Sequence, residues 1–154
     1  MHLQDTLTLE GRYADPELRL QTHPGEIGRA MLSQIEDMVA RIKWSKRDVA
    51  EFAGRYLSEP KPNVFFDPPE APLGRAAFNR QASKAGVALN PKSRLLFAGD
   101  RFFINGEAFT PAADEVPALQ ALADRRRLAP PLPASLRERF HAWHEAGWLE
   151  VDAQ

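Results

Sequence analysis

The sequence predicts an α+β fold, in which an N-terminal helical hairpin is followed by a C-terminal module that combines helices with a small antiparallel sheet. Apolar residues recur every three or four positions before residue 58, and short β-rich runs separated by turn signals follow residue 86. Between them lies the proline-rich stretch EPKPNVFFDPPEAP, which no helix can cross because proline lacks a donor N–H. The predicted parts are a leading segment over 1–26, a helical segment over 27–59, a linker over 60–72 and the mixed module over 73–154.

The helical segment is predicted to contain two amphipathic helices. Ser45 and Asp48 form a capping-box pattern at the start of the second helix, with Asp in place of the usual Glu. A lone hairpin with such apolar faces would leave part of them in water, so a second copy or another domain is expected to cover them. The candidate dimer-interface residues are Ile27, Met31, Ile35, Met38, Ile42, Val49, Phe52 and Tyr56.

The C-terminal module is predicted to be winged-helix-like. A helix over 73–85 ends at Gly86, and the run RLLFAGDRFFINGEAFT contains short strands, with Asn105-Gly106 as a hairpin signal. Helices are then expected over 116–126 and 135–146, the second stopped by Gly147, with a final strand in WLEV. Helices around a small antiparallel sheet indicate a winged-helix type of module.

Composition narrows the function classes. The formal net charge of −1 gives no general attraction to phosphate, and the absence of cysteine removes disulfides and thiol chemistry. No apolar run approaches the roughly 20 residues that span a bilayer, and the N-terminus lacks a signal-peptide pattern. We therefore expect a cytoplasmic protein without membrane contact.

His141 and His144 lie one helical turn apart and could share a face, as two metal ligands would. No third ligand is evident and Glu145 is expected to point elsewhere, so we interpret them as surface or half-buried histidines and predict no metal site. Phe140, Trp143 and Trp148 are expected to face the core.

A basic run, Arg125-Arg126-Arg127, is the candidate nucleic-acid contact, together with Lys84, Lys92, Arg94 and Arg101. From Leu73 onward, eleven Lys and Arg stand against nine Asp and Glu, a net charge of only +2. This balance favours a solvated helix end. The loop carboxylates Asp67, Glu70, Asp114 and Glu115 have no nucleophile or base as a partner in the sequence pattern, and turn or capping roles account for them.

Four segments together resemble a known family: GRYADPEL, THPGEI, RYLSEPKPNVFFDPP and GDRFFINGE. They are similar to the region after the catalytic barrel in bacterial JmjC-type cupins, the ribosomal oxygenases that hydroxylate a ribosomal protein. The resemblance covers nearly the whole chain, from about Leu3 onward. It implies a helical dimerisation region followed by a winged-helix domain, with residues 12–27 as the connector leading out of a barrel.

The resemblance implies a parent activity that uses Fe(II) and 2-oxoglutarate, with iron held by a His-x-Asp/Glu pair and a distal His. None of the four histidines, His2, His23, His141 and His144, begins a His-x-Asp/Glu pattern. No catalytic, cofactor-binding or metal residue is therefore carried over. The chain is expected to be a C-terminal segment without the barrel, whether it was made as an excised piece, is encoded by a shortened gene or survives as a free-standing paralogue.

Two functional hypotheses follow. The first is a non-catalytic homodimerisation and scaffold module that helps to present a ribosomal protein substrate, or that partners a separate cupin barrel. The alternative is an RNA-binding winged helix that uses Arg125 to Arg127, which the charge balance disfavours.

Overall fold

The computed structural model describes residue 23 and residues 25–152 of the chain. It separates into two compact units, Met1–Val49 and Ala50–Gln154. Most of the predicted connector over 1–26 lies outside the described residues, and the predicted domain boundaries stay predictions.

The two predicted N-terminal helices are present. Helix α2 spans Arg29–Ala40 and α3 spans Lys46–Ser58. The capping box is confirmed: the Asp48 amide donates to Ser45 Oγ at 3.1 Å, and the Ser45 amide and hydroxyl donate to Asp48 Oδ2 at 2.9 and 2.7 Å. These hydrogen bonds hold the pKa of Asp48 below its ordinary value. The antiparallel pairing of the two helices stays a prediction, because α2 and most of α3 belong to different compact units.

The short strands predicted in the run RLLFAGDRFFINGEAFT are confirmed, and they form one antiparallel sheet in the order β2-β3-β4, comprising Leu95–Ala98, Arg101–Ile104 and Glu107–Phe109. Its second turn is Asn105-Gly106, with φ of 49° and 90°. Positive φ at both positions is what the hairpin turn matched to strand twist requires, so the Asn-Gly prediction is confirmed.

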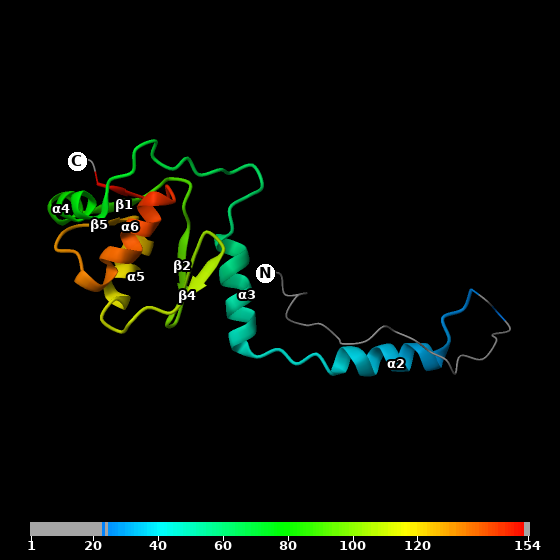
Figure 1. Cartoon of the computed structure of the whole chain (residues 1–154). Helices are drawn as coiled ribbons and strands as arrows, with labels where there is room; N and C mark the ends of the chain where they lie inside the picture. The colour runs from blue at the N-terminus through cyan, green and yellow to red at the C-terminus, as the bar shows by residue number, and fades with distance from the viewer. Residues whose placement is uncertain (1–22, 24, 153–154) are drawn as a thin grey trace. The chain divides into compact units, whose positions relative to one another are not determined.

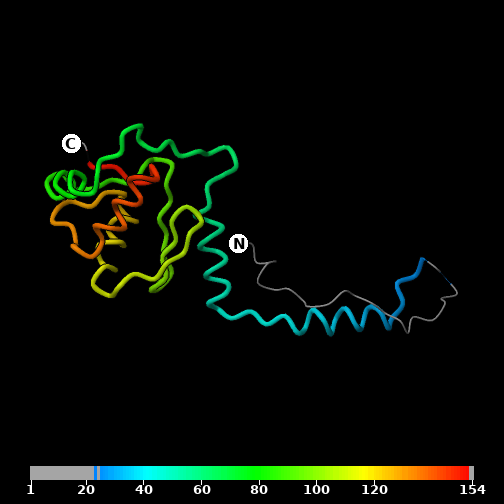
Figure 2. The backbone as a smooth tube through the Cα atoms, in the orientation of Figure 1, coloured from blue at the N-terminus to red at the C-terminus, as the bar shows by residue number. Residues whose placement is uncertain are grey.

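A second three-stranded sheet was missed by the sequence prediction, which expected one small sheet. It has the order β5-β1-β6, formed by Arg127–Leu128, Val87–Leu89 and Leu149–Val151. Only the last strand was predicted. Strands of two and three residues are too short to show an alternating pattern, and β5 begins directly after Arg126, which ends α5 with a φ of 62°. Figure 2 shows the red C-terminal strand returning beside the green segment that contains β1.

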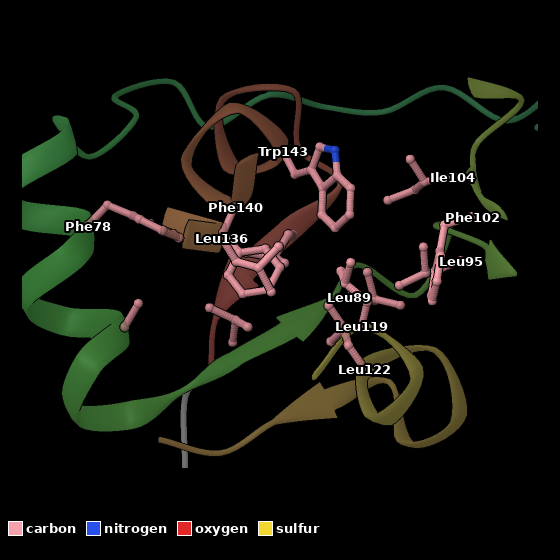
Figure 3. Close-up of a cluster of buried hydrophobic side chains, with 13 residues drawn as sticks. Phe78, Leu89, Leu95, Phe102, Ile104, Leu119, Leu122, Leu136, Phe140 and Trp143 are labelled. Carbon is pink, nitrogen blue, oxygen red and sulfur yellow. The ribbon is translucent and has the colours of Figure 1, made fainter. Parts of the chain in front are cut away.

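Three helices pack with the β5-β1-β6 sheet (Figure 1): α4 over Arg75–Ala85, α5 over Val116–Arg125 and α6 over Arg137–Glu145, the last preceded by a 3₁₀ turn over Ala134–Leu136. The core draws on all three helices and both sheets. Figure 3 shows its side chains converging: Phe78, Leu89, Leu95, Phe102, Ile104, Leu119, Leu122, Leu136, Phe140 and Trp143 are all buried.

The end of α6 follows the sequence prediction in most respects. Gly147 has a φ of 73° and ends the helix in the left-handed conformation. Phe140 and Trp143 are buried, while Trp148 is only partly buried and contacts Phe66 of the proline-rich stretch, with ring centroids 6.1 Å apart.

Candidate interaction surface

Helix α3 rests on the β2-β3-β4 sheet through small and polar residues. Gly54 and Ser58 are its buried positions, and a Cβ at Gly54 would overlap the Phe103 ring. Ser58 Oγ accepts a hydrogen bond from the Gly106 amide at 3.0 Å, and the Arg55 guanidinium donates to the Gly106 carbonyl at 3.1 Å. Helix α3 therefore contacts the β2-β3-β4 sheet through a close approach of its backbone at Gly54 and through the hydrogen bonds of its polar side chains.

Glu51 is the centre of the polar pairing beneath α3. Its carboxylate accepts hydrogen bonds from Arg101 at 2.7 and 3.2 Å and from Arg55 at 2.7 Å. The hydrogen bonds from Arg101 are the main cause that lowers the pKa of Glu51 below 4.5. Partial burial of the carboxyl acts in the opposite direction and raises this pKa, while the hydrogen bond from Arg55 lowers it further. The same pairing raises the pKa of Arg101.

Replacing Glu51 with glutamine is expected to lower the free energy of unfolding by about 1 kcal/mol at pH 7, since the pair is partly exposed. Because the folded carboxyl has the lower pKa, its contribution is present above pH 4.5 and is lost as the pH falls through the folded pKa. The difference between wild type and variant in urea denaturation should therefore shrink below pH 4.5. A difference that stays constant from pH 7 to pH 3 would contradict this role.

The apolar residues of α3 point away from that contact. Val49, Phe52 and Tyr56 are 52, 36 and 61% exposed, and the Phe52 and Tyr56 rings stack with centroids 5.7 Å apart. Their spacing of three and four residues places them on one side of the helix. These three predicted interface residues therefore form an uncovered apolar face.

Helix α2 carries a second uncovered apolar stripe. None of its residues is buried, and Ile27 just before it and Ile35 within it are 61 and 43% exposed. The predicted Met31, Met38 and Ile42 are half-buried. The sequence prediction missed Leu32 and Val39, which are 45 and 59% exposed, although their spacing from Ile35 already placed them beside the stripe.

The two C-terminal histidines are structural, and His144 is buried, not on the surface or half-buried as predicted. The amide of Leu73 donates to His144 Nε2 at 3.3 Å, so Nδ1 carries the proton and donates to the Leu149 carbonyl at 3.3 Å. His141 Nε2 contacts the Leu73 carbonyl oxygen at 2.9 Å. Both imidazoles therefore hold Leu73 against α6.

Glu145 does not point elsewhere as predicted, because its carboxylate lies 3.5 Å from His141 Nδ1. The described residues contain no group of three His, Cys, Asp or Glu side chains that could hold a metal ion. With both nitrogens of His144 bonded to backbone, the described part of the chain does not fit the iron site that the family resemblance implies.

The three arginines of the basic run have different surroundings in the folded chain. Arg126 donates to the carbonyls of Asn90 and Ser93 at 2.8 and 3.1 Å, and Arg127 lies 3.6 Å from Asp152. Arg125 ends α5 and is exposed. Lys92, Arg94 and Arg101 of the proposed basic patch are likewise bonded within the fold, to Asp67, the Leu57 carbonyl and Glu51. These contacts oppose a shared phosphate-binding surface.

The loop carboxylates have local structural roles where the structure shows their partners. Asp67 pairs with Lys92 at 2.9 Å, and Glu115 accepts a hydrogen bond from the Ala112 amide at 3.0 Å, just before α5. Asp114 accepts a hydrogen bond from the Ser135 hydroxyl at 3.5 Å.

None of the helices in the described residues is long and apolar enough to cross a membrane.

The fold defines a class: a winged-helix domain of α+β type, with a helix that exposes its apolar side. The model of the ROXA-like winged-helix family matches residues 34–150, more than half of the chain, so the chain belongs to that family. No curated protein sequence matches the chain significantly.

Solved structures of an Escherichia coli protein support the same fold. The chain matches YcfD, described as a ribosomal oxygenase, with 22% identity and a TM-score of 0.67 over 98% of its length. A YcfD complex with cobalt and 2-oxoglutarate matches with a TM-score of 0.68 at the same identity and coverage. The chain spans 43% of the length of these solved chains.

Proposed function

We propose that this chain is a homodimerisation and scaffold module that helps to present a protein substrate to a ribosomal oxygenase. The observation that carries the proposal is the orientation of α3, which turns small and polar residues to the fold and its apolar residues outward. An exposed apolar face of this kind marks a protein interface. Family membership and the likeness to a ribosomal oxygenase support the link to an oxygenase. The partner substrate that the sequence resemblance implies would be a ribosomal protein.

In this proposed role, the described residues carry out no catalytic step. In the resembled family, iron and 2-oxoglutarate would supply the oxidation, held by residues outside those described here. We propose that what this chain contributes is association and positioning, which hold a partner in a fixed geometry.

The test is self-association in sedimentation velocity, comparing wild type with Phe52→Asp and Ile35→Asp. Burying an unpaired carboxylate costs several kcal/mol, so each variant should shift the dimer to monomer. Both side chains are at least 36% exposed within one chain, so the monomer itself should stay folded.

Ser33→Asp is the matched control. Ser33 is exposed on α2, on the opposite side from Ile35, and the substitution changes the charge by the same amount. It should leave the dimer intact. Variants at Phe52 and Ile35 that dimerise as tightly as wild type would contradict the proposal.

A further inference from the structure

A pocket with a volume of about 570 Å³ lies between the start of β4 and helix α6. Ala142 and Ala146 line it with short side chains, and Trp143 and Trp148 line it with large indoles. Binding pockets commonly have volumes of about 300–1,000 Å³ and a mainly apolar lining with a few polar groups. The pocket therefore has the size and the lining of a site that accepts a side chain of a partner.

The charged residues that line this pocket are Glu107, Glu138 and Arg139. Arg139 is directed to the protein, because its guanidinium lies 4.2 Å from the centroid of the Phe109 ring and its Nε is buried. Glu138 pairs with Arg75, which is outside the lining, at 2.8 Å.

Glu107 has no such neighbour. It is exposed and forms no ion pair within the part of the chain that the structure describes. Asp114, which is bonded to Ser135 of the lining at 3.5 Å, places a further carboxylate beside the pocket. The charge left for an occupant to pair with is therefore negative.

The indoles also favour a cationic occupant. Trp148 is half-buried, so part of its surface is accessible, whereas Trp143 is 5% exposed. Tryptophan is the side chain that best attracts an ammonium or guanidinium group to the face of its ring. A cationic side chain in this pocket can therefore contact an indole and the Glu107 carboxylate together.

The free edge of β4 borders the pocket. Strand β4 is at one end of the order β2-β3-β4 and pairs only with β3 among the described strands. Ile104 and Glu107 flank the two-residue turn as a hydrogen-bonded pair, so alternation directs the backbone N–H and C=O of Ala108 away from β3. Phe109 contacts Trp143 with ring centroids 5.7 Å apart, and Glu107 shares its face of the strand. A strand added to this edge would place alternate side chains on the side of the pocket.

We propose that the β4 edge and this pocket receive an extended segment of a partner protein, which inserts a lysine or arginine side chain. The segment adds to β4 through the backbone of Ala108, and its cationic group pairs with Glu107 and contacts Trp148. The inference gives the proposed scaffold a partner site. It rests on the partner-presenting part of the proposed function and does not depend on the dimer.

Tryptophan fluorescence can report the occupancy of this pocket. The chain has three tryptophans, of which Trp143 and Trp148 line the pocket, and Trp44→Phe removes the signal of the third. The full chain with this substitution is titrated with short blocked peptides of alternating valine and threonine that differ only in a central lysine, glutamate or norleucine. We expect the lysine peptide to change the fluorescence saturably and to bind about tenfold more tightly than the other two.

Glu107→Gln should weaken binding of the lysine peptide about fivefold, because it removes the charge and keeps the shape of the side chain. Asp124→Asn is the matched control. Asp124 is exposed and lines the pocket between α3 and β2 instead, so its loss of charge should leave the affinity unchanged. Added salt should weaken binding to the chain with Glu107 more than binding to the Glu107→Gln variant.

Equal affinities for the lysine, glutamate and norleucine peptides, or no saturable binding of any of them, would overturn the inference. An unchanged affinity in Glu107→Gln would do the same. A lysine peptide that is N-methylated throughout its backbone should not bind, and tight binding of that peptide would overturn the strand addition. Peptide binding by a chain that stays monomeric would reject the proposed dimer and leave this site standing, whereas a dimer that binds no peptide would do the reverse.

Discussion

Replacing Trp143 with alanine is expected to lower the free energy of unfolding by about 3–5 kcal/mol, because it leaves a large cavity in the core. Trp143 is 5% exposed and packs against Phe140 and Phe109, with ring centroids 5.8 and 5.7 Å away. Far-UV circular dichroism during urea denaturation measures the change.

The matched control is Phe65→Ala, another loss of an aromatic ring. Phe65 is 71% exposed, so its variant should unfold within about 0.5 kcal/mol of wild type. Equal losses for the two variants would mean that Trp143 is not a core residue in solution.

Replacing Gly54 with alanine is expected to lower the free energy of unfolding by about 2 kcal/mol, although alanine favours a helix by about 1 kcal/mol. The added Cβ would overlap the Phe103 ring, which is 1% exposed and cannot move into solvent. The α3 helix must therefore shift away from the β2-β3-β4 sheet. Urea denaturation monitored by circular dichroism again gives the measurement.

Gly74→Ala is the control for this substitution, because nothing lies within 4 Å of a Cβ at Gly74 and its φ is −59°. It should change the free energy of unfolding by less than about 1 kcal/mol. A stabilised Gly54→Ala protein would show that α3 does not approach Phe103 as closely as the structure has it.

The predictable parts of the fold were those with strong local signals. The Ser45–Asp48 cap, the Asn105-Gly106 turn and the left-handed Gly147 all follow from short-range chemistry, and all three are present. Strands β1 and β5 could not be predicted, because two or three residues show no periodicity and their pairing joins segments about 40 residues apart.

The candidate surface was predicted less completely than the fold. Periodicity identified the apolar faces of both helices, yet it could not show which side of α3 contacts the fold. That depends on the absence of a side chain at Gly54 and on the partners of Glu51 and Ser58, which are Arg101 and Gly106. The pocket between α3 and β2 was missed for the same reason, since its lining comes from four separate segments, within 50–57, 95–98, 103 and 123–124. His144 was misjudged because its burial depends on contact with Leu73, 71 residues away in sequence.

The central claim is that the uncovered apolar faces of α2 and α3 hold two copies of the chain together. Sedimentation equilibrium of the wild-type chain over a wide concentration range tests it most directly. The account predicts a mass that rises to twice that of the monomer and goes no higher, as a closed two-fold interface requires. A mass that stays at the monomer value up to the highest concentration would contradict it.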